Sequence, residues 1–250
     1  MPTTGVTCSL FPATRETKMI TSYLRRGLVA GLLAGLLAGV FAFFIGEPIL
    51  DKAIHLEEAT GGHHEEVFSR ATQKAGLFFA TGLFGVTVGG IFGLVYTYFR
   101  DRMVSGTDWT RSLSLAAAIF AGAILIPFLK YPANPPGIGD PATIGARTTA
   151  YYTMVALSLL AVLVAWQTAR ILRERKISAP VRQLSVGLGF ALVVTALLVA
   201  LPAAPDPGGF PAGLLWDFRL SSLGTQVIFW TGLGVTFGLL CERANHRGSL

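Results

Sequence analysis

Six stretches of the chain are long and apolar enough to cross a lipid bilayer, because a membrane-spanning helix needs about 20 predominantly apolar residues. The composition agrees: 52% of the residues are hydrophobic and 14% are charged, whereas a soluble domain carries about 25% charged residues. The predicted spans are Gly27 to Gly46, Ala75 to Phe99, Ser112 to Leu129, Ala150 to Leu172, Val181 to Leu201 and Ser222 to Cys241. We therefore predict an all-α, polytopic membrane protein, a bundle of six transmembrane helices.

The distribution of lysine and arginine predicts the orientation of this bundle. Cytoplasmic flanks of membrane spans carry an excess of these residues. If the N-terminus is cytoplasmic, fourteen of the 20 basic residues lie on the inner side and six on the outer side. We expect both termini to be cytoplasmic. The same bias accounts for the net charge of +6 without nucleic acid, since no aromatic residues interleave the basic clusters as they do in nucleic-acid channels.

The first 18 residues differ from the rest of the chain, because they are neither apolar nor periodic. Met19 opens a segment, MITSYLRRGLVAGLLAG, that is typical of the start of a membrane protein. We expect residues 1–18 to be a disordered extension, with Met19 as an alternative start, and residues 19–250 to form one transmembrane domain. Cys8 and Cys241 are the only cysteines, and both are predicted on the inner side, so we expect no structural disulfide.

Glycines spaced by four residues form a ridge along the first span. Small residues let helices approach closely in lipid, where packing depends on van der Waals contact. The ridge could pack against another helix of the same chain or against a partner subunit, and both alternatives stay open. Its members are Gly27, Gly31, Gly35 and Gly39.

Directly after this span, residues 47–66 read EPILDKAIHLEEATGGHHEE and hold three of the four histidines and six of the fourteen acidic residues. Pro48 suits the first turn of a helix, and we predict a short amphipathic outer helix there. Glu47, Asp51, His55 and Glu58 would share a stripe about 80° wide. Gly61 and Gly62 would end the helix, so that His63 and His64 could fold back over it.

Imidazole and carboxylate groups suit divalent first-row metals such as cobalt, nickel and zinc. We therefore predict a metal-capture site on the outer face, with no permanently bound cofactor. The alternative is an interfacial helix whose polar stripe is simply hydrated. The predicted metal ligands are Glu47, Asp51, His55, Glu58, His63 and His64.

We predict no catalytic residues. A zinc-protease motif would require a histidine four positions after His63 or His64, and Val67 and Phe68 stand there. The predicted spans carry no ionisable group near mid-bilayer, where such groups mark ion pathways. Two outer connections rich in proline and glycine, one of them Lys130 to Ile144, could instead frame a pocket.

Five segments resemble the family of proposed cobalt transporter subunits, CbtA, and together they cover nearly everything from Met19 to the last span. They are LRRGLVAGLLAGLLAG, GEPILDKAIHLEEA, SRATQKAGLFFATGLFGVTVGGIFGLV, LKYPANPPGIGDPATIGARTTAY and FPAGLLWDFRLSSLGTQVIFWTGLG. The resemblance implies a bacterial inner-membrane protein that takes up cobalt(II) for cobalamin synthesis. It also implies a small single-span, histidine-bearing partner resembling CbtB.

Three functions are consistent with these features. The first is a membrane subunit of a cobalt or nickel uptake system that captures the ion at the outer stripe. The second is a non-conducting accessory or metal-sensing subunit that docks a partner through the glycine ridge. The third is a membrane enzyme or lipid-interacting protein, for which a deep polar pocket under Asn134 and Asp140 would be the distinguishing feature.

Overall fold

The computed structural model describes residues 11–59, 68–103, 106–136, 138–204 and 208–248, and every regular element within these ranges is helical. Six helical segments are long and apolar enough to span a membrane, and each coincides with one predicted span, so the predicted fold is confirmed. The α-helices are α1 (Phe11–Phe41), α2 (Glu47–Ala59), α3 (Arg70–Phe99), α4 (Asp108–Phe120), α5 (Ile126–Lys130), α6 (Ile144–Glu174), α7 (Ala179–Ala200) and α8 (Ala212–Gly248).

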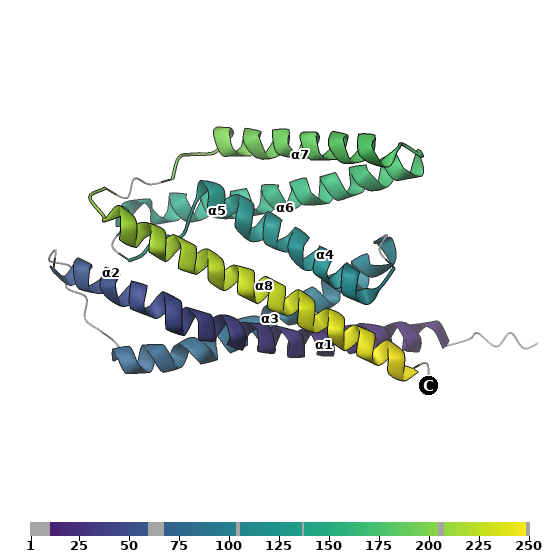
Figure 1. Cartoon of the computed structure of the whole chain (residues 1–250), viewed down its shortest axis with the longest axis horizontal. Helices are drawn as coiled ribbons and strands as arrows, with labels where there is room; N and C mark the ends of the chain where they lie inside the picture. The colour runs from purple at the N-terminus through teal and green to yellow at the C-terminus, as the bar shows by residue number, and fades with distance from the viewer. Residues whose placement is uncertain (1–10, 60–67, 104–105, 137, 205–207, 249–250) are drawn as a thin grey trace, which may run out of the picture.

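The start of α1 and the end of α8 lie at one end of the bundle, and α2 lies at the other (Figure 1). We call these the terminal end and the α2 end. The connection from α5 to α6 and the connection from α7 to α8 also lie at the α2 end. Helix α1 begins at Phe11 and so takes in the second half of the predicted extension, whereas residues 1–10 lie outside the described residues.

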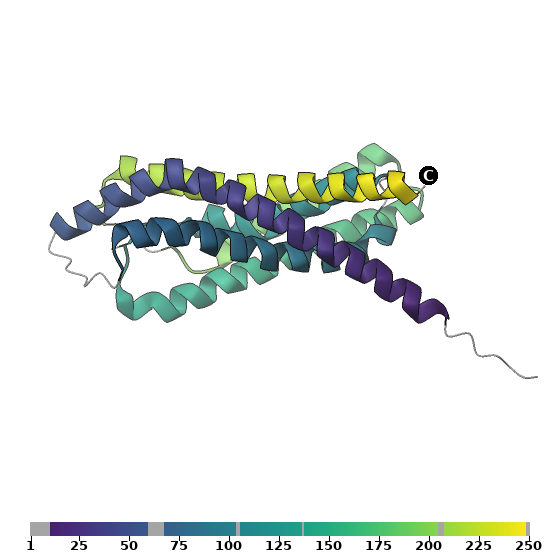
Figure 2. The ribbon, with the colours of Figure 1, turned by 90° about the horizontal axis from the view of Figure 1, so that it is seen from below.

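The predicted outer helix is α2, but it does not begin separately after the first span. A π-helical segment, Ala42–Gly46, joins α1 to α2, and the two form one long helix (Figure 2). Pro48 has no N–H to donate and its ring crowds the preceding turn. The π segment absorbs this defect, and the amide of Glu47 donates to the carbonyl of Ala42. A second π segment, Ala121–Leu125, joins α4 to α5 just before Pro127.

The glycine ridge packs against α3 of the same chain. A Cβ atom added at Gly31 would overlap the carbonyl oxygen of Gly85, and one at Gly27 would overlap that of Gly89. A Cβ atom at Gly35 would overlap the carbonyl oxygen of Thr81, and one at Gly39 would meet the side-chain hydroxyl of Thr81. The two backbones therefore touch directly, which only glycine permits. This contact is intramolecular, so a partner subunit would find the ridge already covered.

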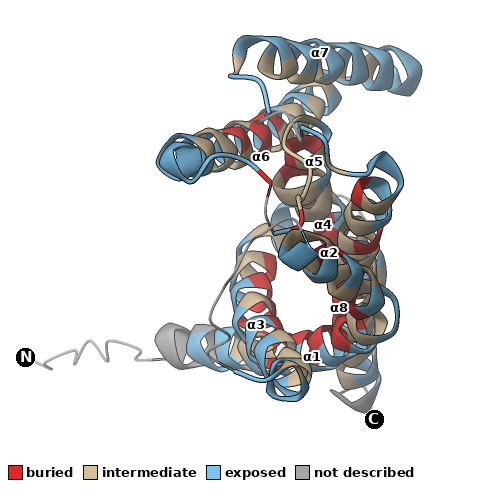
Figure 3. Cartoon of the chain, turned by 90° about the vertical axis from the view of Figure 1, so that its left-hand side faces the viewer, coloured by how far each residue is buried: buried red, intermediate tan, exposed pale blue. Residues whose placement is uncertain are grey.

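A second face of α1 packs against α8 through small residues. Ala30, Ala34 and Ala38 are buried, and Gly232 of α8 lies against Ala34. Nearer the terminal end, large aromatic side chains fill the space between α1, α3 and α8. The ring of Phe237 on α8 lies 4.9 Å from that of Tyr96 on α3. In Figure 3 the buried residues of α1, α3 and α8 lie on the faces that these helices turn toward one another, and they form most of the hydrophobic core.

A buried carboxylate closes the terminal end of this core. Asp108, at the start of α4, accepts hydrogen bonds from the hydroxyl of Tyr96 at 2.5 Å and from the side-chain amide of Asn245 at 3.0 Å. The guanidinium of Arg111 lies 3.7 Å from the same carboxylate. Three elements distant in sequence, α3, α4 and α8, are thereby joined by one charged group.

We expect Tyr96→Phe to destabilise the protein by about 1–3 kcal/mol, because it removes one partner from a buried carboxylate and leaves the packing of the ring unchanged. Thermal unfolding in detergent measures the effect. Tyr98→Phe is the matched control, since the Tyr98 side chain lies two positions away and is exposed. Equal unfolding temperatures for the two variants would contradict the role given to this hydrogen bond.

Helices α6 and α7 form a hairpin beside this core. None of the residues of α7 is buried, and α7 lies at the edge of the bundle in Figure 3, coloured as exposed or intermediate along its length. One buried serine of α6, Ser158, holds this helix to the π segment after α4, because its hydroxyl donates to the carbonyl of Gly122. The exposed apolar surface of α7 is what a lipid-facing helix requires.

Candidate functional site

The first two residues of the predicted stripe lie at the junction between α2 and α3. Nη2 of Arg70 is 2.8 Å from Oε2 of Glu47 and 2.5 Å from Oδ1 of Asp51. Nζ of Lys74 is 2.8 Å from Oδ2 of Asp51. Glu47 is buried, with 11% of its side chain exposed. Two cations of α3 therefore neutralise two carboxylates of α2, and this ion-pair cluster fixes α2 onto the start of α3.

The other two described members of the stripe lie further along α2 and are open to solvent. Nδ1 of His55 is 3.4 Å from Oε2 of Glu58, and their side chains are 79% and 55% exposed. This pair presents an imidazole nitrogen and a carboxylate to the aqueous side of the α2 end. Both groups are ordinary ligands for divalent metals.

The stripe is thus divided into two pairs. Within the described residues, no three histidine, cysteine, aspartate or glutamate side chains come together in a group that could hold a metal ion. His63 and His64 lie outside the described part of the chain. The four helical residues do not converge as a single ligand set, although His55 and Glu58 do lie together.

Sequence reasoning missed Arg70 and Lys74 as partners of the stripe. Both belong to the six basic residues that the sequence predicts on the outer side. They are four residues apart, and Glu47 and Asp51 are also four residues apart. Two acids in the first turns of one helix and two bases with the same spacing in the first turns of the next helix are a signal for cross-helix ion pairing. That signal was available without a structure.

Buried charge is confined to the two ends of the bundle. Among the described residues, the buried charged side chains are Glu47 at the α2 end and Asp108 at the terminal end. Between them the buried polar groups are hydroxyls, such as that of Ser112, which donates to the carbonyl of Gly234. The sequence prediction that the spans lack a mid-membrane charge agrees with this arrangement.

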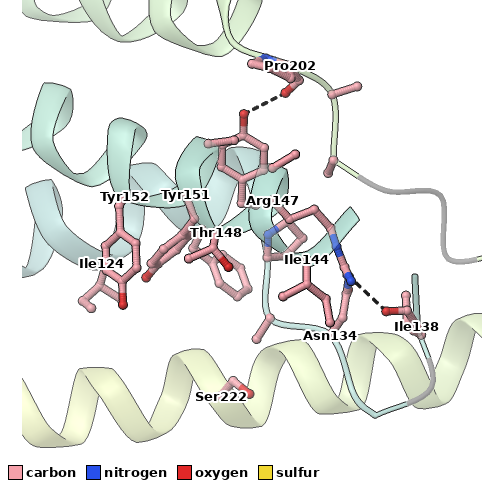
Figure 4. Close-up of a pocket in the computed structure, with 18 of the residues that line it drawn as sticks. Ile124, Asn134, Ile138, Ile144, Arg147, Thr148, Tyr151, Tyr152, Pro202 and Ser222 are labelled. Atoms are coloured by element: carbon pink, nitrogen blue, oxygen red, sulfur yellow. Dashed lines mark hydrogen bonds between the residues drawn. The ribbon is translucent and has the colours of Figure 1, made fainter. Parts of the chain in front are cut away.

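A cavity of about 750 Å³ opens at the α2 end between α6, α8 and the connection from α5 to α6 (Figure 4). Asn134 lines it, as expected for a pocket framed by this connection, whereas Asp140 does not. The carboxylate of Asp140 instead accepts a hydrogen bond from the amide of Ala142, at 2.8 Å. The other lining groups include Tyr131, Arg147, Thr148, Tyr151, Tyr152, Ser222 and Gln226.

The wall of this cavity is held by hydrogen bonds to backbone carbonyls. The guanidinium of Arg147 donates to the carbonyls of Ile138 and Asp140, both at 3.3 Å. The hydroxyl of Tyr131 donates to the carbonyl of Pro202 at 2.8 Å, which links the two outer connections (Figure 4). Burial raises the pKa of the Tyr131 phenol, so it stays a neutral donor.

The helical bundle with six candidate spans defines a multi-pass membrane protein. Residues 20–242 match the family described as "Probable cobalt transporter subunit (CbtA)", and the chain belongs to this family. The match includes all of α2 and the apolar part of every span. No curated protein and no solved structure matches the chain. The family describes a transporter subunit, which is a non-enzymatic role.

Proposed function

We propose that the protein is the membrane subunit of an uptake system for cobalt(II) or nickel(II), with the α2 end on the outer face of the bacterial inner membrane and both termini in the cytoplasm. The observation that carries this proposal is the family match, which spans α2 and the whole bundle. The excess of basic residues at the terminal end supports the orientation.

In the capture step, the metal ion meets the exposed residues of the α2 end first and the buried residues afterwards. His55 and Glu58 are the accessible pair, and we propose that His63 and His64 complete the ligand set with them. Glu47 and Asp51 lie behind this pair and would have to exchange Arg70 and Lys74 for the metal. Their ion pairs therefore keep the inner part of the stripe closed while no metal is bound.

Passage across the membrane has to rely on uncharged groups or on a partner. A bare divalent ion in hydrocarbon carries a large desolvation cost, and the buried charges of the described residues lie only at the two ends of the bundle. Backbone carbonyls, hydroxyls and water remain within the chain. A small single-span subunit with histidines near the membrane would supply further ligands.

That lack of charge also favours a second candidate function, a non-conducting accessory or metal-sensing subunit. Its docking surface would not be the glycine ridge, because α3 covers it. Metal binding by the purified protein, without transport in liposomes under any combination with a partner, would favour this function over uptake.

The test of the capture step is a triple variant, His55→Ala with His63→Ala and His64→Ala. In proteoliposomes that hold the protein and its partner, we expect uptake of labelled cobalt at limiting metal to fall about tenfold or more, because three imidazole ligands are lost. Uptake should recover at high metal concentration. His246→Ala, which changes the remaining histidine at the terminal end, is the matched control. Unchanged uptake by the triple variant at limiting metal would exclude the capture role.

A further inference from the structure

The cavity at the α2 end is lined by a positively charged side chain, whereas three of the four helical residues of the stripe on α2 are acidic. Among the described residues that line it, Arg147 carries the only charge, and none of them is a carboxylate. Two more cations stand next to it. Nη2 of Arg219 donates to Oδ1 of Asn134 at 2.9 Å, and Nζ of Lys130 donates to the carbonyl of Leu198 at 2.6 Å. Such a site attracts an anion and repels a free divalent cation.

Polar atoms of the cavity retain unused hydrogen-bonding capacity. Nε of Arg147, a donor, is buried and has no hydrogen-bond partner. Nε of Arg219, whose side chain contacts Asn134, is also buried without a hydrogen-bond partner. A buried polar atom without a partner is costly, and guanidinium groups match the oxygens of a phosphate particularly well. The unused donors thus favour a ligand that carries a phosphate group.

The position of the cavity relative to the apolar spans indicates the rest of the ligand. Ile124 and Gln226 belong to apolar runs of the third and last spans, whereas Asn134 and Arg147 lie beyond the apolar runs. The cavity therefore crosses the boundary between membrane and water. On α6, the lining residues Ile144 and Tyr152 are 56% and 65% exposed, which opens this side toward lipid.

We propose that this cavity binds the head group of an anionic phospholipid, with its phosphate at Arg147 and its acyl chains against the apolar wall of α6. The chemistry shared with a free phosphate is the phosphate group, and the apolar residues at the membrane side of the cavity, among them Ile124 and Phe128, favour a lipid over a free phosphate. The volume of about 750 Å³ lies in the range of ordinary ligand sites.

A bound lipid would also stabilise the connection that frames the site. Gly139 has a φ of +94°, and a Cβ atom there would press on the guanidinium of Arg147. The same guanidinium holds the carbonyls on both sides of Gly139, those of Ile138 and Asp140. Arg147 therefore joins the ligand to the loop. This role is independent of metal capture, because no residue of α2 lines the cavity.

Native mass spectrometry of the full chain in detergent tests the proposal with three probes. They are dioctanoyl phosphatidylglycerol, dioctanoylglycerol with the same tails and no phosphate, and inorganic phosphate with no tails. We expect one phosphatidylglycerol per protein, bound at least about tenfold more tightly than either other probe, since a charge-assisted hydrogen bond contributes roughly this factor. Equal binding of dioctanoylglycerol would overturn phosphate recognition. Equal binding of inorganic phosphate would overturn the assignment to a lipid.

Variants locate the binding in the cavity. Arg147→Ala should weaken phosphatidylglycerol binding about tenfold or more, and Arg147→Lys should restore part of it. Thr148→Trp, at an exposed position on the cavity wall, should block the site while Arg147 and its loop contacts remain. Arg170→Ala, at the opposite end of α6, is the control. Parent-like lipid binding by folded Arg147→Ala or Thr148→Trp protein would overturn the proposal.

Discussion

Replacing Gly31 with leucine is expected to eliminate the folded protein. The added Cβ would overlap the carbonyl oxygen of Gly85, and the Cα of Gly89 lies next to it. Neither atom belongs to a side chain that can turn away, so α1 and α3 would have to separate. Overpacking usually costs about 1–3 kcal/mol, and separation of two central helices should exceed that range. The yield of monodisperse protein on size-exclusion chromatography measures the loss.

The matched control for this variant is Gly187→Leu. Gly187 also lies in a membrane helix, but nothing lies within 4 Å of a Cβ added there. We expect this variant to purify like the parent protein, and Gly31→Ala to give an intermediate yield and a lowered unfolding temperature. A Gly31→Leu protein with the unfolding temperature of the parent would show that α1 and α3 do not touch through their backbones.

The second large effect is expected from Arg70→Ala. This change leaves the buried carboxylate of Glu47 without its cation and Asp51 with Lys74 alone, so we expect a loss of about 1–3 kcal/mol in the free energy of unfolding. Adding Glu47→Gln should recover part of the loss, since the unpaired charge is then removed. Arg170→Ala, which breaks an exposed pair with Glu174, should cost at most about 1 kcal/mol.

The same variant separates two roles for Glu47 and Asp51. If these carboxylates also receive metal, Arg70→Ala frees them from a competing cation, and cobalt binding by the purified protein should become tighter. Isothermal titration calorimetry measures the affinity. Reduced stability together with unchanged cobalt affinity would assign Glu47 and Asp51 to the α2–α3 junction alone and restrict capture to the histidines and Glu58.

The spans were predictable because their signal is local: about twenty apolar residues in a row require a membrane whatever their neighbours are. The glycine ridge was predictable as a contact surface for a similar reason. Its partner was not, because Gly85 and Gly89 become neighbours only through the antiparallel path of α3. The sequence prediction left open whether the ridge meets a helix of the same chain, and the structure supplies that answer.

The α2 end was predicted less completely. The spacing of Glu47, Asp51, His55 and Glu58 correctly indicated a helix, but helical spacing says nothing about which cations face it. Arg70 and Lys74 come from another helix and divide the stripe. The cavity combines α6, α8 and two loops far apart in sequence, and of its lining residues only Asn134 was predicted to lie at a pocket.

The π segment between α1 and α2 determines the helical phase of everything that follows it. Twelve residues of α-helix separate two positions by about 120° around the axis, so Asp51 would point well away from the face that Gly39 presents to α3. A π turn takes up one extra residue, which reduces that difference to about 20°. The backbone contacts of the glycines and the ion pairs of the carboxylates therefore share one face. If residues 42–46 were wound as plain α-helix with no residue removed, Glu47 and Asp51 would turn by about 100° away from α3 without any change in sequence.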